Sequence, residues 1–330
     1  MKRINKDYLY LSIGGVIILL VSLLGLAIGS VRVDVYSYFF AKPDPTTSYI
    51  ITNLRLPRVI MSLLAGSGLA VCGTAYQAIF RNPLSDPYIL GVSSGASLGA
   101  AIAIILGLDI FMFGITIPAF ITALITVWTI VKLASVGNRL HNTTLLLSGI
   151  SINFLMAAII SLIMVLNRDS MDKIIFWTMG SLSASQFSDL WIVFTFVSIG
   201  ILVIRIFAKD LNILLIGSDT ARSLGVDVER TKKIILFFST LMIAVIVSYC
   251  GVIGFIGLIV PHIVRLLVGT DDRRIIPYSI LGGMLFTLLA DILARTLIAP
   301  SEIPIGAITS IIGAPFFIFL LYNAKKKLNP

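Results

Sequence analysis

The sequence predicts an all-α membrane protein, a single transmembrane domain over residues 1–330 with about ten membrane-spanning helices. Apolar residues make up 58% of the chain, charged residues only 12%, and mean hydropathy is +1.02. A soluble domain of this size carries about 25% charged residues to cover its surface. Each of six runs without Asp, Glu, Lys or Arg reaches the ~20 residues that cross a hydrocarbon core as a helix. These runs are residues 8–31, 59–80, 87–108, 110–131, 142–167 and 303–324.

Four further spans are predicted where charges interrupt the apolar pattern. Residues 190–204 and 275–290 become spans if the neighbouring charges, Asp189, Arg205, Asp291 and Arg295, lie at the membrane interface. The apolar run 234–264 is too long for one span and lies between two polar loops that both look cytoplasmic. An even number of crossings is therefore needed there. We expect two helices, at about 234–249 and 252–268, broken at "CGVIGFIG".

The distribution of positive charge predicts the orientation. With both termini inside, ten spans assign 18 of the 25 Lys and Arg residues to the cytoplasmic side. The net charge of +9 then reflects orientation and contact with anionic lipid, and it does not imply a nucleic-acid partner. The N-terminal apolar run has a 24-residue core without an A-x-A-like cleavage site. We expect an uncleaved first span with both termini on the cytoplasmic side.

Small residues recur along the predicted spans at spacings that let helix backbones approach closely. Tight packing within the monomer is favoured over a dimer face for both glycine groups. The first group is Gly66, Gly68 and Gly73, and the second is Gly91, Gly95 and Gly99. Cys72 and Cys250 both fall within apolar helices, so we expect buried free thiols.

Residues suited to catalysis are sparse. No G-x-x-x-x-G-K-[ST] motif occurs, so this chain is not expected to hold ATP, and no other bound cofactor is expected. His141 and His262 have no Cys, Asp or Glu at ligand spacing, which argues against a metal site. The acidic residues that an ion-coupled carrier would place in mid-membrane are also missing. Asp86, Asp109, Asp189 and Asp291 all fall at predicted helix ends.

One polar segment, "IGSDTARSLGVDVERTKK" at residues 216–233, stands out within a loop over about 209–233. Ser218 or Asp219 is expected to cap a short helix that Gly225 ends. Ala221 and Leu224 would share one face of it. Asp227 would cap the helix that follows. Taken alone, the segment fits equally well an amphipathic loop on the membrane surface.

The wider pattern resembles the permease subunits of bacterial ABC importers for iron–siderophore, haem and cobalamin, the FecCD or type II importer family. The resemblance covers the chain from about residue 50 to the C-terminus. In order, the motifs that carry it are "RLPR" from Arg55, "GTAYQAIFRNPLSDPYILGVSSGASLGA" from Gly73, "FWTMGSLS" from Phe176, the segment "GSDTARSLGVDVERTKK", "GVIGFIGLIVPHIVRLLVGTDDRR" from Gly251, "LLADILAR" from Leu288 and "EIPIGAITSIIGAPFFIFLL" from Glu302.

The resemblance implies two docking surfaces. Family members hold a dimer of cytoplasmic ATPase subunits, which use ATP and Mg, against coupling helices. The matching residues here are Asp219, Ala221, Arg222, Ser223, Leu224 and Gly225. On the outer side, family arginines receive glutamates of an extracytoplasmic substrate-binding protein. The matching residues are Arg55, Arg58 and Arg295, for which interfacial snorkelling is the alternative.

The resemblance also implies a pathway between two permease copies, lined by the fifth and tenth spans. In the fifth span it points to Ser148, Ser151, Asn153, Met156 and Met164, although plain packing is the commoner role of such residues. The cytoplasmic gate would use Leu84 and either Asn142 or Thr143. The second copy is either identical or a paralogue.

The predicted function is therefore that of a transport subunit and not of an enzyme. The chain would move iron(III)–siderophore, or a similar bulky metal chelate, into the cytoplasm with energy from the separate ATPase. Haem or cobalamin import by the same mechanism is the alternative substrate class. A secondary carrier needing no ATPase remains as a different class, and an intramembrane enzyme lacks a Ser/His or His/Asp/Glu constellation.

Overall fold

The structure, a computed structural model, describes residues 2–40, 44–136 and 139–328, and it confirms the all-α class. The α-helices are α1 (Lys2–Ala27), α2 (Val35–Phe40), α3 (Pro45–Tyr49), α4 (Leu56–Phe80), α5 (Val92–Ile105), α6 (Thr116–Ala134), α7 (Asn142–Leu166), α8 (Met171–Thr178), α9 (Phe187–Ile206), α10 (Ala208–Ile216), α11 (Ser218–Ser223), α12 (Val228–Cys250), α13 (Ile256–Val268), α14 (Asp272–Thr296) and α15 (Ile305–Leu328).

Short elements connect them. A π-helical segment, η1 (Ile50–Arg55), joins α3 to α4, and three 3₁₀ turns are η2 (Pro87–Leu90), η3 (Leu108–Ile110) and η4 (Arg168–Ser170). Two strands of two residues each, β1 (Ser135–Val136) and β2 (Arg139–Leu140), pair antiparallel before α7.

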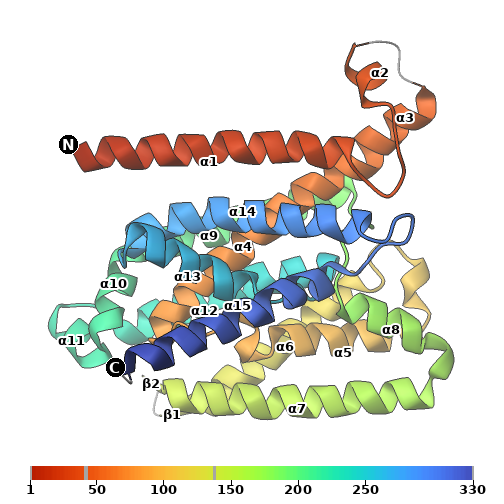
Figure 1. Ribbon diagram of the computed structural model, residues 1–330. Coiled ribbons are helices and arrows are strands. Elements are labelled where there is room, and N and C mark those ends of the chain that lie inside the picture. The colour runs from red at the N-terminus through yellow and green to blue at the C-terminus, as the bar shows by residue number, and fades with distance from the viewer. Residues whose placement is uncertain (1, 41–43, 137–138, 329–330) are drawn as a thin grey trace.

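The long helices run side by side between two ends of the molecule (Figure 1). Among the described residues, seven helices are long and apolar enough to cross a membrane, and three shorter apolar helices accompany them. Each of the ten predicted spans falls on one of these helices, while ten crossings stay a prediction. The beginning of α1 and the end of α15 lie at the same end as α10, α11 and the two strands. The opposite end carries α2, α3 and α8.

Two boundaries bear on the site. The chain leaves α12 at Cys250 and enters α13 at Ile256, which confirms the predicted break. Helix α14 covers residues 272–296 and so extends past both limits of the predicted span 275–290. Asp291 and Arg295 therefore lie inside the helix and are buried, and the placement of Asp291 at a helix end is wrong. Opposite charges that contact these residues, described below, make this possible.

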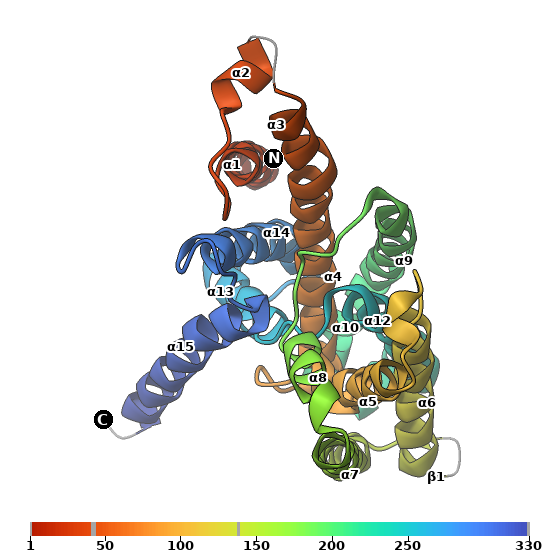
Figure 2. The ribbon, with the colours of Figure 1, turned by 90° about the vertical axis from the view of Figure 1, so that its right-hand side faces the viewer.

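Helix α4 passes through the middle of the bundle and is buried along most of its length (Figure 2). Glycines allow its close contacts: a Cβ on Gly73 would lie 1.8 Å from the carbonyl oxygen of Gly257 on α13. A Cβ on Gly66 would lie 2.2 Å from that of Gly283 on α14. Gly95 and Gly99 meet α6 in the same way, so both glycine groups pack within the monomer, as predicted. Cys72 and Cys250 are buried free thiols, also as predicted.

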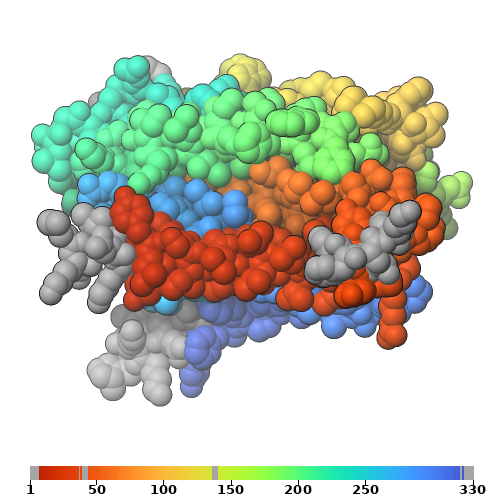
Figure 3. Space-filling model, turned by 90° about the horizontal axis from the view of Figure 1, so that it is seen from above, coloured from red at the N-terminus to blue at the C-terminus, as the bar shows by residue number. Residues whose placement is uncertain are grey.

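Three helices, α1, α7 and α15, are only partly covered by the rest of the bundle. Helix α1 lies along the outside of the bundle beside α14 (Figure 3). Helices α7 and α15 also leave many large apolar side chains exposed, among them Phe154, Leu162 and Ile311. Exposed apolar surface of this extent is expected where lipid or a second copy of the chain covers the protein.

The glycine contacts give a first testable prediction. Gly73→Ala is expected to destabilise the fold by about 1–3 kcal/mol, because a methyl group forces α4 and α13 apart. The control is Gly15→Ala, since a Cβ at Gly15 on α1 meets nothing within 4 Å. Thermal unfolding of both variants in the same detergent measures the difference. Equal midpoints for the two would show that α4 and α13 do not pack as described.

Candidate functional site

Five charged side chains gather at the end of the bundle that carries α2, α3 and α8. Arg58, in the first turn of α4, donates from Nε to Asp291 Oδ1 of α14 at 2.8 Å. Its Nη1 donates to Glu302 Oε2, also at 2.8 Å. On α14, Arg295 Nε lies 3.4 Å from Asp291 Oδ2. Asp291 is fully buried, and because it contacts Arg58 and Arg295, its negative charge neutralises part of the positive charge of these two buried arginines.

Arg55 lies at the same end of the bundle, where it donates hydrogen bonds to backbone carbonyls. It ends η1, and its Nη1 donates to the carbonyl oxygens of Leu26 and Ala27 at 2.7 Å each. These carbonyls belong to the last turn of α1, whose partial negative charge favours a cation. Arg295 adds a bond of 2.8 Å from Nη2 to the carbonyl of Gly25. The two arginines thus hold α1 against α4 and α14.

The three arginines of the predicted docking surface meet in one pocket. Arg55, Arg58 and Arg295 line it together with Glu302 and Ser183. With Asp291 beneath, three positive charges face two negative ones, which leaves the pocket electropositive. All three arginines are buried and already bonded within the chain. Docking of a binding protein on them stays a prediction, and Ser183 at the rim is exposed.

The polar segment at the other end forms a small helical projection. The expectation that Ser218 or Asp219 caps α11 is wrong: Gly217, with φ +153°, is the N-cap and Ser218 is the first helical residue. Gly225 ends the helix at φ +85°, as predicted. Its N–H donates to Arg222 O and the next N–H donates to Ala221 O, both at 3.0 Å, which satisfies the last carbonyls. Asp227 caps α12 through the Arg230 N–H, also as predicted.

The residues of this projection have different environments. Leu224 is 61% exposed, whereas Ala221 is fully buried. The expected common face of these two residues stays a prediction. Asp219, Ser223 and Gly225 are exposed. Ala221 anchors the projection to the core, and Leu224 is the apolar side chain that it presents outward. The contact of these residues with an ATPase stays a prediction.

Hydrogen bonds link the projection to the beginning of α7. Arg222 of α11 donates to Glu229 Oε1 on α12 at 3.0 Å, and Glu229 Oε2 accepts the N–H of Leu140 at 2.9 Å. Three residues further on, Lys232 donates to Asn142 Oδ1 at 2.9 Å. A movement of α11 would therefore pull on the first turn of α7.

The predicted gate residues are only partly brought together. Asn142 and Thr143 line one pocket with Arg222, Glu229 and Lys232 of the polar segment 216–233. Asn142 also donates to the carbonyl of Ile79 at the end of α4, at 3.0 Å. Leu84 is exposed in the loop before η2 and does not belong to the residues that line this pocket.

Two carboxylates in the loops between helices have shifted pKa values. Burial raises the pKa of Asp86 to about 6, although its bond from the Tyr88 N–H acts in the opposite direction. Hydrogen bonds from the Arg273 side chain, and then from Asn212, lower the pKa of Asp271 to about 2. Asp271 therefore stabilises the folded chain above its ordinary pKa of 3.8, and that contribution is lost as the pH falls toward 2. It ties α10 to α14.

The predicted pathway residues lie along α7 on more than one face. Ser151 is exposed, while Ser148, Met156 and Met164 are half-buried. Asn153 accepts a hydrogen bond from Ser94 on α5, so it contributes to packing inside the chain. Their role in a pathway stays a prediction.

Four charged residues of these two sites were not identified from the sequence. Asp291 and Glu302 pair with an arginine 233 and 244 residues away, and Glu229 and Lys232 bond residues 89 and 90 positions away. Such contacts leave no local signal. The only hint is that Asp291 and Glu302 sit in two of the motifs that carry the resemblance.

The comparisons with known proteins agree with this architecture. The FecCD transport family matches residues 17–323. The cobalamin import system permease protein BtuC of Halobacterium salinarum is 41% identical over 86% of this chain and 75% of its own length. The hemin transport system permease protein HmuU of Yersinia pestis is 37% identical over 94% of this chain and 95% of its own.

A solved structure gives the same result for the fold. A metal-chelate type ABC transporter, determined in an inward-facing conformation, matches with a TM-score of 0.84 and 31% identity. The match covers 95% of this chain and 99% of the other. Together with the family match over nearly the whole chain, this settles the assignment. The chain belongs to the FecCD transport family, the permease subunits of type II ABC importers.

Proposed function

We propose that this chain is half of a permease dimer that moves a bulky metal chelate into the cytoplasm. The favoured substrate is iron(III)–siderophore. The observation that carries the proposal is the projection α11, which presents Leu224 outward and is bonded through Arg222 and Glu229 to the beginning of α7. A secondary carrier, which works without an ATPase, does not need such a projection.

The partners follow from the two ends of the molecule. Two ABC ATPase subunits would dock on α11 and its counterpart, and would bind and hydrolyse ATP with Mg. A substrate-binding protein would dock at the electropositive pocket of Arg55, Arg58 and Arg295. This places α10, α11 and both termini in the cytoplasm and the pocket outside the bacterial cell membrane, in agreement with the distribution of Lys and Arg.

The substrate class rests on the relatives and on the composition of α7. Relatives are permeases for hemin, for cobalamin and for Fe(3+)-citrate, which are all metal chelates. Along α7, a few hydroxyl and thioether groups stand among aliphatic side chains. Sparse polarity allows a bulky ligand to pass without being held. Haem and cobalamin are the alternative substrates.

Reconstitution tests the proposal directly. The permease with its ATPase and binding-protein partners, in vesicles loaded with ATP and Mg, is expected to take up radiolabelled ferric siderophore. Parallel vesicles with hemin or cobalamin, and vesicles without ATP, are the controls. Uptake driven by an ion gradient without the ATPase would overturn the proposed function. Uptake of hemin or cobalamin alone would overturn only the substrate.

A substitution at the pocket rim tests the docking surface without disturbing its buried charges. Ser183→Glu is expected to place a carboxylate beside the arginines and to weaken affinity for the binding protein by about tenfold or more. Ser183→Gln has the same size without the charge and should bind almost normally. Titration of the labelled binding protein onto the permease complex measures both. Identical affinities for the two variants would argue against docking at this pocket.

A further inference from the structure

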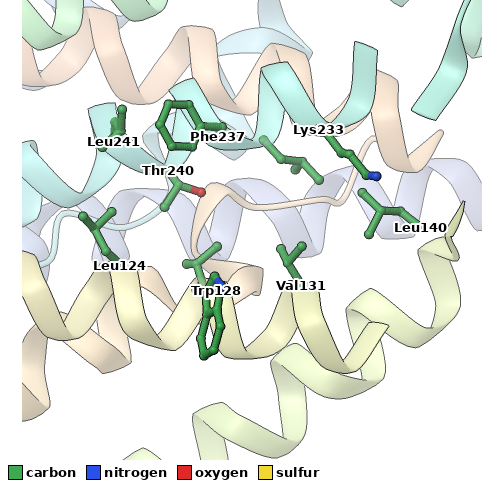
Figure 4. Close-up of a pocket in the computed structure, with 10 residues that line it drawn as sticks. Leu124, Trp128, Val131, Leu140, Lys233, Phe237, Thr240 and Leu241 are labelled. Carbon is green, nitrogen blue, oxygen red and sulfur yellow. The ribbon is translucent and has the colours of Figure 1, made fainter. Parts of the chain in front are cut away.

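An apolar groove runs between α6 and α12 (Figure 4). Most of its residues on α12 belong to the half of that helix that follows α11 along the chain. It has a volume of about 370 Å³. The residues that line it are Leu124, Val127, Trp128, Val131, Leu140, Lys233, Leu236, Phe237, Thr240 and Leu241. Trp128 and Phe237 are 62% and 58% exposed, so the groove opens on the outer surface of the bundle. This surface faces the hydrocarbon core in a membrane protein.

Among the side chains that the structure describes, positive charge lies at one end of the groove. Lys233 lies there beside Leu140, as Figure 4 shows, and its side chain forms part of the wall. Lys132 holds its ammonium 4.9 Å from the centre of the Trp128 ring, one turn further along α6. Both lysines are exposed. The nearby carboxylate of Glu229 accepts from Arg222 and from the Leu140 N–H. Lys233 also takes part in an interaction within the chain, and its exposed ammonium can still meet a ligand.

Size and charge together restrict the occupant. A helix with its side chains is about 10 Å across, so a hollow of this volume takes no more than about one turn of it. An acyl chain fits such a groove along its length. Two lysines at its end, at the depth where α6 finishes and α12 begins, match a phosphate at the membrane surface.

We propose that the groove between α6 and α12 is a binding site for an anionic phospholipid of the inner leaflet. One acyl chain lies between Trp128 and Phe237, and the headgroup phosphate lies between Lys132 and Lys233. Because α12 begins directly after the coupling projection, a lipid bound here contacts the helix that α11 moves. The site itself does not depend on the identity of the substrate.

Tryptophan fluorescence of the full chain in vesicles tests the site. The chain contains three tryptophans, and Trp177→Phe with Trp191→Phe leaves Trp128 as the only reporter. Phosphatidylglycerol with brominated acyl chains, mixed into unbrominated phosphatidylcholine, is expected to quench Trp128 more strongly than brominated phosphatidylcholine does. The matched reporter is Trp191, which is 74% exposed on α9 and outside the groove. It should respond to both lipids alike.

Charge removal completes the test. Lys132→Gln and Lys233→Gln are each expected to lower the apparent affinity for phosphatidylglycerol about fivefold. Lys209→Gln on α10, an exposed lysine away from the groove, should leave it unchanged. Equal quenching of Trp128 by the two lipids, or no effect of either lysine, would overturn the proposal. Absent quenching of Trp128 with normal quenching of Trp191 would also overturn it, because the groove would then be covered by protein.

Discussion

Leu224→Asp is expected to reduce substrate uptake to background while the ATPase subunits still hydrolyse ATP. Leu224 is the exposed apolar residue at the end of α11, and in the proposed complex it fills a groove of the ATPase. A buried anchor of this kind dominates the energy of an interface, and a carboxylate in its place leaves an unpaired charge at the contact. The ATPase subunits would then hydrolyse ATP without changing the conformation of the permease.

The fold itself should tolerate this change. The side chain is mostly in solvent, and a carboxylate near the end of a short helix costs only about 0.3–1 kcal/mol. Uptake and ATP hydrolysis are measured on the same vesicles, with thermal unfolding of the isolated permease as the check on folding. Leu224→Met keeps an apolar anchor and is the matched control. Wild-type uptake by Leu224→Asp would show that α11 does not transmit force through this residue.

The fold class and the positions of the spans were predictable because lipid imposes them. A chain that must satisfy its backbone within a hydrocarbon core forms helices of about 20 apolar residues, and these are visible in the sequence. The break after Cys250 followed from topology alone. Gly225 and Asp227 act on their nearest neighbours, so their roles could be predicted from local chemistry.

Two of the contacts could not be predicted because their partners are far apart along the chain. Asp291 looked interfacial because its partner Arg58 is 233 residues away, and only the folded bundle shows that the charge is neutralised inside α14. The hydrogen bond from Lys232 to Asn142 could not be predicted either, because these residues are 90 positions apart in the sequence. The prediction of the α11 cap failed for a different reason. The N-cap is Gly217, with φ +153°, and Ser218 is already the first residue of the helix. A side-chain cap is not used there.

The structure also changes how the three arginines of the predicted docking surface can be tested. Reversing the charge of Arg58 or Arg295 would place an acidic group against the buried Asp291. Loss of uptake in such variants would therefore report misfolding as readily as lost docking. The rim position Ser183 avoids this difficulty, because its side chain is exposed and carries no buried charge.

The largest effect on stability is expected from Asp291→Asn. The amide keeps the shape of the carboxylate, but it leaves Arg58 and Arg295 buried near each other without the charge that they share. Removing one partner of a buried ion pair costs about 3–5 kcal/mol. The loss should fall toward the low end of this range, since Glu302 still pairs with Arg58. Denaturant unfolding in mild detergent measures it.

A second carboxylate at the same end of the bundle supplies the matched control. Asp109 pairs with Lys173 at 2.7 Å, but the lysine side chain is 63% exposed. Asp109→Asn should therefore have little effect on stability, because solvent screens this exposed pair. Adding Arg295→Met to Asp291→Asn should restore part of the lost stability, because it removes a charge that has no partner. If Asp291→Asn instead behaved like Asp109→Asn, water would reach the arginines, and they would be available to the carboxylates of a docking protein.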